Sequence, residues 1–241
     1  MFSIALIGPD GAGKTTIARM LEERSSLPLK YIYMGVNIAA SNFTLPTSRF
    51  FEYLRARQNE NHDLAAAEGH ASPTRGNGKW SAGKVLWAAG KLAHQLADEW
   101  YRQFYSWGYQ WIGHIALYDR HYLFDFSLGG VDVEQEGFDT RLHRWFLTYL
   151  YPRPDLVIYL DAPAEVLFAR KGEKGIEDLD RRRKSFLELM GQSPNCFVVD
   201  GTQPLPKVYS DVSRHIIEFY KMQLRNAIPP RRKKPDSLPP A

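Results

Sequence analysis

The 241-residue sequence has little cysteine, little net charge and no long apolar run. Its one cysteine, Cys196, cannot form an internal disulfide. That is typical of a reducing compartment, so we expect a cytoplasmic location. No run of about 18 apolar residues occurs, so no membrane span is expected. The N-terminal apolar run extends only from Phe2 to Ile7 and follows no basic segment, which argues against a signal peptide.

The charge balance is mildly basic, with 31 lysines and arginines against 27 acids and a formal net charge of +4. This excess does not by itself indicate nucleic acid as the main ligand, and it is compatible with anionic small molecules. The 18 glycines and 15 prolines are near average usage, which excludes a collagen-like or wholly disordered chain. The length suits one globular domain with an appendage.

Five short apolar runs predict buried strands, at residues 2–7, 31–34, 115–118, 156–160 and 197–199. Each of the last three is followed by an aspartate: Asp119, Asp161 and Asp200. Helical patterns lie between the runs, which indicates a parallel sheet covered on both faces. In such sheets ligands bind beyond the carboxyl ends of the strands.

The domain is expected to span residues 1–228, with a mostly polar, exposed insertion at 57–79 and a tryptophan-rich helix within 80–111. That helix is predicted from about Ala82 to Phe104. Its expected buried stripe comprises Val85, Ala89, Leu92, Leu96, Trp100 and Phe104. The tryptophans are interpreted either as helix packing or as a docking surface for a partner, a membrane or an aromatic ligand.

Residues 229–241 are rich in proline and contain four consecutive cations, Arg231 to Lys234. Proline removes backbone donors and like charges repel, so we expect a disordered tail. The tail is either simply solvated or adheres weakly to acidic lipid or nucleic acid.

The segment Gly8-Pro9-Asp10-Gly11-Ala12-Gly13-Lys14-Thr15 matches the pattern GxxxxGK[ST] in full. It follows a predicted strand and precedes a predicted helix, as a phosphate-binding loop requires. Glycines let backbone N–H groups close around phosphate oxygens, and the helix points its positive end at the anion. Lys14 is placed to reach the β- and γ-phosphates of a nucleotide, and the Thr15 hydroxyl to ligate Mg²⁺.

Other residues argue against two classes of phosphate-loop protein, the GTPases and the motor ATPases. The chain contains no Asn-Lys-x-Asp, which a GTPase would use to read guanine, and no apolar strand that ends in Asp-Glu, as in many motor ATPases. The third strand ends instead in Asp119-Arg120. A carboxylate there can orient magnesium waters or an acceptor hydroxyl, and the arginine can clamp a phosphate. A strand-end ion pair is the alternative.

The sequence resembles the thymidylate kinase family of nucleoside monophosphate kinases. Its phosphate loop has the family's acid at the third position, Asp10, and Asp119-Arg120-His121 resembles the family's Asp-Arg motif. Residues 154–161 and the following Pro163-Ala164-Glu165 resemble its fourth strand and next helix. Residues 200–204 resemble its last strand and turn. These motifs occur in the family's order from Phe2 to about Tyr220.

The resemblance implies a three-layer α/β/α P-loop kinase fold with a five-stranded parallel sheet. It implies that ATP and Mg²⁺ are used, with Thr15 and Asp119 at the metal. Asp10 would lie near the acceptor's sugar hydroxyl. The residues expected to contact ATP are Gly8, Asp10, Gly11, Ala12, Gly13, Lys14, Thr15, Thr16, Gly201 and Thr202. The catalytic set is expected to be Lys14, Asp119, Arg120, which would hold acceptor phosphate, and Arg170.

Residues 170–175 fall where the family has its lid, and three cations and two glycines among them suit a mobile loop closing over ATP. Because the phosphate loop has Ala12 where some members have arginine, Arg170 is the candidate lid cation. One of Arg181, Arg182 and Arg183 is expected to face the phosphates. The resemblance also implies helix-mediated homodimers, with the tryptophan-rich helix as candidate face.

The acceptor side departs from the family. Tyr33-Met34-Gly35-Val36-Asn37 stands where the family has Phe-Pro and a basic residue. Ala97-Asp98-Glu99 stands where its long helix carries Ala-Asp-Arg. Arg102 lies one turn further on and could replace that arginine only if the helix register shifts. Tyr33, Tyr122 and Phe124 are either base-stacking residues or core.

The first expectation is therefore transfer of the ATP γ-phosphoryl to a nucleoside monophosphate, with dTMP as the first candidate. The alternatives are a kinase of the same fold acting on a non-nucleotide or sugar-type metabolite, and a non-catalytic nucleotide-binding scaffold.

Overall fold

The computed structural model describes residues 1–35, 42–43, 45, 47, 82–127, 138–172, 175–190 and 195–227. The predictions for an insertion at 57–79 and for a tail at 229–241 lie outside these residues.

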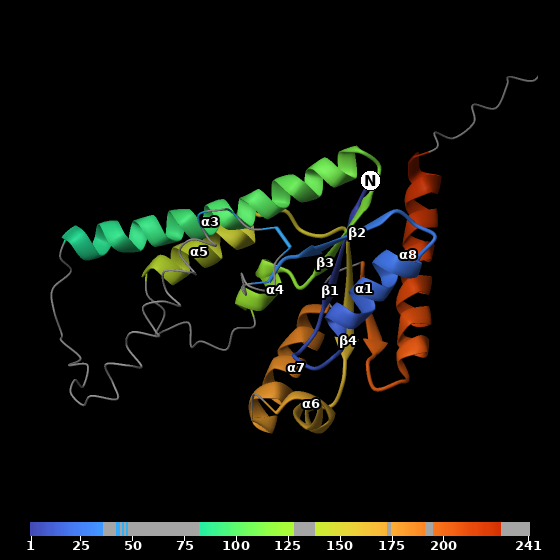
Figure 1. The fold of residues 1–241 in the computed structure, drawn as a ribbon. Helices are drawn as coiled ribbons and strands as arrows, with labels where there is room; N and C mark the ends of the chain where they lie inside the picture. The colour runs from blue at the N-terminus through green and yellow to red at the C-terminus, as the bar shows by residue number, and fades with distance from the viewer. Residues whose placement is uncertain are drawn as a thin grey trace, which may run out of the picture.

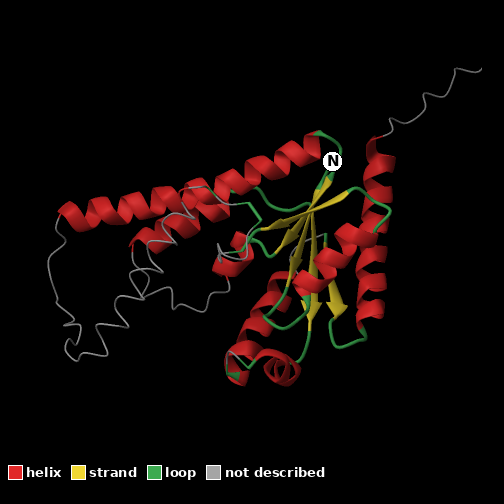
Figure 2. Cartoon of the chain, viewed as in Figure 1, coloured by secondary structure: helices red, strands yellow, loops and turns green. Residues whose placement is uncertain are grey.

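The core of the protein is one five-stranded sheet in which every strand is parallel to its neighbours (Figure 2). The strands are β1 (Ser3–Ile7), β2 (Leu29–Tyr33), β3 (Ile115–Asp119), β4 (Leu156–Asp161) and β5 (Cys196–Asp200). Their spatial order is β2-β3-β1-β4-β5, so β1 lies at the centre. The register pairs Leu6 with Asp119, which sets the end of β3 beside the start of the phosphate loop.

Helices cover both faces of the sheet, so the predicted three-layer α/β/α fold is confirmed (Figure 1). On one face lie α1 (Lys14–Arg24) and α8 (Leu205–Ala227). On the other lie α3 (Ala82–Trp111), α4 (Tyr122–Ser127), α5 (Phe138–Tyr149) and α7 (Ile176–Met190). The short α6 (Ala164–Lys171) follows the carboxyl end of β4. A helix is expected to begin at Pro163-Ala164-Glu165, and Pro163 is its N-cap.

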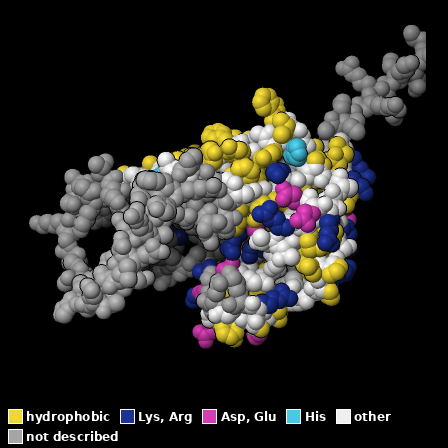
Figure 3. Space-filling view, in the orientation of Figure 1, with side chains coloured by type: hydrophobic (Ala, Val, Ile, Leu, Met, Phe, Trp, Pro, Cys, Tyr) yellow, Lys and Arg dark blue, Asp and Glu magenta, His cyan; other side chains and the backbone are white. Residues whose placement is uncertain are grey.

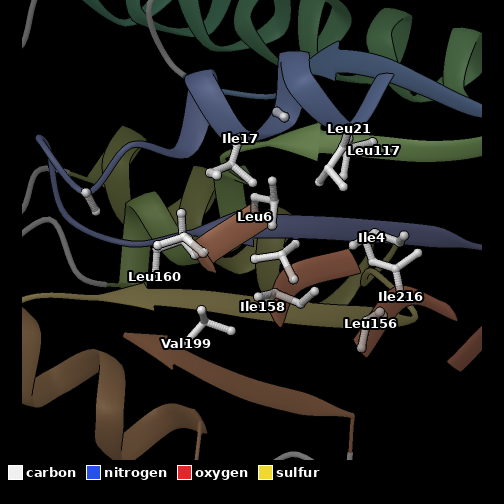
Figure 4. Packing of buried hydrophobic residues seen from close by; sticks show 14 of the residues in the cluster. Ile4, Leu6, Ile17, Leu21, Leu117, Leu156, Ile158, Leu160, Val199 and Ile216 are labelled. Atoms are coloured by element: carbon white, nitrogen blue, oxygen red, sulfur yellow. The ribbon is translucent and has the colours of Figure 1, made fainter. Parts of the chain in front are cut away.

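Alternate residues of each strand enter two separate hydrophobic clusters, because successive side chains point to opposite faces. Ile4 and Leu6 of β1 pack with Ile17 and Leu21 of α1 on one face (Figure 4). Ala5 and Ile7 join the second cluster, to which α4, α5 and α7 contribute Tyr122, Leu147 and Phe186. Every residue of β1 is buried, which explains its continuous apolar run.

The predicted buried stripe of α3 is wrong. Phe104 is 60% exposed, Ala89 is exposed, and Leu92, Leu96 and Trp100 are only half-buried. Five polar residues form the buried face instead: Asp98, Glu99, Arg102, Gln103 and Ser106. The helix also continues past Phe104 to Trp111 and ends before Gly113, whose φ of 93° interrupts it.

The buried polar face of α3 is held by partners on other elements. The Arg102 guanidinium is 1% exposed, bonds Asp98 at 2.5 Å, and donates to the Gly35 carbonyl at 2.8 Å. Glu99 meets His143 of α5 at 2.8 Å. Because buried charges are tolerated when paired and hydrogen-bonded, these contacts let the polar face rather than the aromatic face turn inward.

We predict that Arg102→Ala lowers the free energy of unfolding by about 3 kcal/mol, because the buried Asp98 carboxylate loses its counter-ion. Urea denaturation measures the change. Lys91→Ala is the matched control, since Lys91 is an exposed cation of the same helix, and its effect should stay within about 0.5 kcal/mol. Equal effects of the two substitutions would contradict the buried placement of Arg102.

Candidate active site

The phosphate loop joins β1 to α1, and glycines with positive φ shape its path. Gly8 has φ 146°, and a Cβ there would lie 2.6 Å from the Leu160 carbonyl oxygen of β4. Gly13 occupies the N-cap of α1 with φ 88°, and no side chain caps the first turn. The first backbone N–H groups of α1 are therefore available to an anion, in line with the helix dipole.

Lys14 lies within this loop, with only 5% of the residue exposed. Its Nζ donates a hydrogen bond to the Pro9 carbonyl at 2.7 Å, so the ammonium group arches back over the loop. Of the other predicted loop residues, Ala12 is buried, Gly11 is partly exposed, and Thr15 and Thr16 are exposed on the first turn of α1. The loop thus presents backbone donors and a cation in one place, which is the chemistry that phosphates require.

The end of β3 brings Asp119 to the phosphate loop. Asp119 is 0% exposed, and its Oδ2 accepts a hydrogen bond from Thr15 Oγ1 at 2.5 Å. A second hydrogen bond to the same oxygen comes from Tyr31 Oη in β2, at 3.1 Å. Among the described residues, Asp119 Oδ1 has no hydrogen-bond partner. The two residues predicted at the metal, Thr15 and Asp119, are therefore in direct contact.

Arg120 adopts a left-handed conformation, with φ 70°, that is uncommon for a residue with a side chain. Its N–H donates to the Leu6 carbonyl at 3.0 Å, which ties this turn to β1. From there the guanidinium forms an ion pair with Asp10 of the phosphate loop. Backbone strain of about 1–2 kcal/mol is retained only where the surroundings enforce it, and such residues cluster at functional sites.

The turn after β5 lies against the other side of the phosphate loop. The Gly201 N–H donates to the Asp161 carbonyl at 2.6 Å, and a Cβ on Gly201 would lie 3.5 Å from the Ala12 carbonyl oxygen. Thr202 donates through both its N–H and its hydroxyl to the Asp200 carboxylate, which lowers the pKa of that group. The predicted Gly201-Thr202 element is thus placed beside the loop.

Arg170 lies in the last turn of α6, which ends at the left-handed Gly172. Its Nη1 donates to the Gly201 carbonyl at 3.1 Å and reaches the Gly11 carbonyl at 3.4 Å. The guanidinium therefore bridges the phosphate loop and the turn after β5. Residues 173–174 of the predicted lid segment lie outside the described residues.

The three consecutive arginines of α7 pair with two different aspartates. Arg183 binds the Asp161 carboxylate at the end of β4 through two hydrogen bonds, of 2.7 and 2.8 Å. Arg181 and Arg182 both pair with Asp178 of their own helix. Arg183 is therefore the one that reaches the carboxyl edge of the sheet.

The region predicted to face the acceptor contains buried aromatic and polar groups. Tyr33 is 6% exposed and Tyr122 2%, and both belong to the hydrophobic clusters, whereas Phe124 is half-buried. Gly35 is crowded, because a Cβ there would lie 2.6 Å from both Arg120 Cδ and the Tyr33 hydroxyl. His121 is fully buried against aromatic rings, and burial lowers its pKa to about 4, which keeps the imidazole neutral at physiological pH.

The side-chain oxygens of Thr15 and Asp119 fit the coordination of Mg²⁺. The described part of the chain holds no cluster of three or more His, Cys, Asp or Glu side chains that could enclose a metal ion. Magnesium does not need one, since it binds one or two protein oxygens and keeps phosphates and waters as its other ligands. The Thr15 hydroxyl and the unpaired, buried Asp119 Oδ1 supply such oxygens beside the phosphate loop.

Comparison with known proteins adds independent findings. A probable thymidylate kinase of Archaeoglobus fulgidus is 30% identical over 118 residues, which is 46% of this chain and 57% of that protein. The thymidylate kinase of Alcanivorax borkumensis is 37% identical over 77 residues, or 28% of this chain and 37% of its own length. The chain is similar to thymidylate kinases. The resemblance predicted from the motifs is therefore confirmed over the matched lengths, which reach about half of the curated relatives or less.

Two further comparisons are less informative. No protein-family model matches the sequence. A solved structure of a deoxyadenosine kinase from M. mycoides, with products dCMP and dCDP bound, aligns with a TM-score of 0.49 and 15% identity, over 90% of this chain and 99% of that one.

Within the described residues, none of the helices combines the length and apolar character needed to cross a membrane.

Sequence reasoning missed three features of the site. Tyr31 was predicted only as part of a buried strand, and nothing in the local pattern connects it to Asp119 across 88 positions. The pairing of Arg183 with Asp161 joins two recognised motifs, so their common edge of the sheet could have indicated it. Arg102 was considered only with a shifted helix register, yet its i,i+4 spacing from Asp98 is an ordinary helical ion-pair signal.

Proposed function

We propose that the protein is an ATP-dependent phosphotransferase of the thymidylate kinase type, which transfers the γ-phosphoryl group of ATP to a nucleoside monophosphate, with dTMP as the first candidate. The observation that carries this is the contact of Thr15 with Asp119 beside Lys14. A phosphate loop, a lysine and a strand-end carboxylate at one point are the parts that phosphoryl transfer needs. The similarity to thymidylate kinases supports the same class.

In the proposed mechanism, an acceptor oxygen attacks the γ-phosphorus in line, the bond to the leaving ADP oxygen breaks, and no covalent enzyme intermediate forms. The α1 amides and Lys14 hold the β- and γ-phosphates, since both lie in the loop. Thr15 and Asp119 would hold Mg²⁺. Bound magnesium neutralises charge on the transferring phosphates. Asp119 would in addition orient the acceptor.

The two arginines at opposite sides of the loop have different proposed roles. Arg120, paired with Asp10, would turn to the acceptor phosphate when that anion arrives. Arg170, which already reaches the Gly11 and Gly201 carbonyls, would stabilise charge developing on the transferred group. The Gly201-Thr202 turn would lie against adenine. Exclusion of water by closure over ATP would limit wasteful hydrolysis.

One observation favours a second candidate, a kinase of the same fold with a non-nucleotide or sugar-type acceptor. Arg102 is the cation nearest to the position where the family's long helix holds acceptor phosphate. Here it is 1% exposed and engaged by Asp98 and by the Gly35 carbonyl. An acceptor site that relies on Arg120 for its cation suits a ligand different from thymidylate.

We propose in addition that the protein forms a homodimer through an aromatic surface on α3 and α5. Phe104, Trp107 and Trp111 of α3 are 60%, 41% and 92% exposed, and Trp145 and Tyr149 of α5 are 48% and 72% exposed. Figure 3 shows hydrophobic side chains along the upper edge of the molecule, over the C-terminal half of α3. Large exposed aromatic surfaces are costly in water and mark interaction sites.

We also propose a cytoplasmic location, which the single half-buried Cys196 supports.

The proposed activity predicts that an acceptor stimulates ADP release from Mg·ATP. The panel comprises dTMP, dUMP, other nucleoside monophosphates, nucleosides and sugar phosphates, with a control lacking acceptor. Strong stimulation by dTMP supports the first candidate, and stimulation by a sugar phosphate alone supports the second.

Lys14→Ala should abolish transfer with the fold retained, while Lys207→Ala on α8, which changes an exposed lysine, should leave transfer unchanged. Normal turnover by Lys14→Ala would refute the phosphate-site assignment.

Arg170→Ala is expected to lower kcat by about 100-fold and to change ATP affinity by less than about threefold, because the guanidinium acts mainly on charge that develops during transfer. Steady-state kinetics and direct ATP titration separate the two effects. Arg214→Ala, which removes an exposed arginine of α8, is the matched control and should leave both values unchanged. A loss confined to ATP affinity would show that Arg170 only binds the donor.

The homodimer predicts a solution mass of twice the 27.7 kDa chain in light scattering. Trp111→Glu should shift that mass to the monomer, because a carboxylate buried in the interface would be desolvated without a partner. Leu224→Glu on α8, which changes a 48% exposed apolar residue elsewhere, should leave the mass unchanged. A monomeric wild-type protein would refute the interface.

A further inference from the structure

Tyr31 is a buried tyrosine whose hydroxyl is directed at the candidate active site. It lies in the middle of β2, is 1% exposed, and packs in the cluster between the sheet and α1. Its Oη donates to Asp119 Oδ2 at 3.1 Å. None of the roles proposed above for the loop, the arginines or the turn after β5 accounts for a phenol at this point.

The hydrogen bonds on Asp119 are distributed unequally between its two oxygens. Oδ2 accepts from both Tyr31 and Thr15, at 3.1 and 2.5 Å. Oδ1 is buried and, among the described residues, has no partner. A buried carboxylate oxygen without a donor is unfavourable, so it is retained where a ligand supplies the missing contact. Two donors on one oxygen hold the carboxylate in a single rotamer and leave the other oxygen for that ligand.

The phenol is suited to act as a permanent donor. A phenol keeps its proton at neutral pH, so the Tyr31 hydroxyl can donate its hydrogen bond to Asp119 throughout. The Arg19 guanidinium lies 3.8 Å above the ring centroid, and this contact fixes the plane of the ring. The ring is thus held from one side by α1 while its hydroxyl reaches the end of β3.

Thr15 can keep its bond to Asp119 when a metal ion is bound. A hydroxyl has one proton to donate and two lone pairs to offer, so Thr15 can donate to Asp119 and ligate Mg²⁺ at the same time. Tyr31 donates a second hydrogen bond to Oδ2. This bond keeps the carboxylate in place when the threonine hydroxyl turns toward a ligand. Outer contacts of this kind orient metal-binding carboxylates.

We propose that Tyr31 is a positioning residue for the magnesium–nucleotide site, acting through Asp119, whose Oδ1 it directs toward the metal and its waters. The inference rests on the proposed function, because it assumes that the loop binds Mg·ATP. It assigns the hydroxyl, rather than the ring, to the site: phenylalanine at position 31 would keep the packing and the Arg19 contact and lose only the bond to Asp119.

The test compares nucleotide binding with and without magnesium in Tyr31→Phe. The probe is the ATP analogue AMPPNP, titrated by calorimetry in Mg²⁺ and in EDTA, so that no turnover is required. We expect the half-saturating Mg²⁺ concentration to rise about tenfold, the typical effect of removing an outer contact to a metal ligand. AMPPNP affinity in EDTA should stay within about twofold, since the loop amides and Lys14 are untouched.

Two further variants separate positioning from packing. Tyr159→Phe removes an equally buried hydroxyl from β4, whose ring stacks on Phe186 in the other cluster, and should leave the Mg²⁺ dependence unchanged. In Asp119→Asn, adding Tyr31→Phe should have no further effect on Mg²⁺ dependence, because the residue through which Tyr31 acts is already altered.

Several results would overturn the inference. An unchanged Mg²⁺ requirement in Tyr31→Phe, equal losses of affinity with and without Mg²⁺, or additive effects with Asp119→Asn would each assign Tyr31 a purely structural role. Loss of the folded state in Tyr31→Phe, monitored by thermal unfolding, would do the same. Failure of the wild-type protein to bind AMPPNP at all would instead refute the proposed function, so the two failures are distinguishable.

Discussion

The hydrogen bond between the Thr15 hydroxyl and the Asp119 carboxylate joins the phosphate loop to the end of the neighbouring strand. Its position depends on the parallel register of β1 and β3, which sets Leu6 opposite Asp119. The loop itself can close only because Gly8 passes within contact distance of the β4 backbone. Three strands thus meet at one edge of the sheet, and the cationic side chains Lys14, Arg120 and Arg170 each contact a residue of the phosphate loop.

Helix α3 shows how pairing of charge can override an apolar pattern. Its aromatic residues suggest a buried stripe, yet Arg102 and Glu99 are inside and Trp111 is 92% exposed. Burial of a guanidinium is tolerated because Asp98 and the Gly35 carbonyl accept its hydrogen bonds, and Glu99 is paired with His143. Desolvation still raises the pKa of Glu99. The aromatic side chains are left outside, where they form the surface proposed for a partner copy.

Local patterns predicted the phosphate loop, α1 and the five strands because each has a short-range cause. Glycine spacing specifies the loop, and continuous apolar runs mark strands that are covered on both faces. The ends of two elements differ from the prediction. Strand β2 spans Leu29–Tyr33 rather than residues 31–34, and α3 ends at Trp111 rather than Phe104. The Gly113 turn, rather than the apolar period, ends α3. Residues 173–174 of the lid segment and the insertion at 57–79 stay predictions, since both lie outside the described residues.

By itself the sequence predicted the phosphate loop, because GxxxxGK[ST] and the aspartate after the third strand need only short-range context to be recognised. Tertiary structure alone decided which side chains reach that site. Tyr31 meets Asp119 across 88 positions, and Arg102 meets Gly35 across 67. Such contacts depend on strand order and on which helix face packs inward, and both are set by the sum of burial and charge pairing over the whole chain rather than by any local pattern.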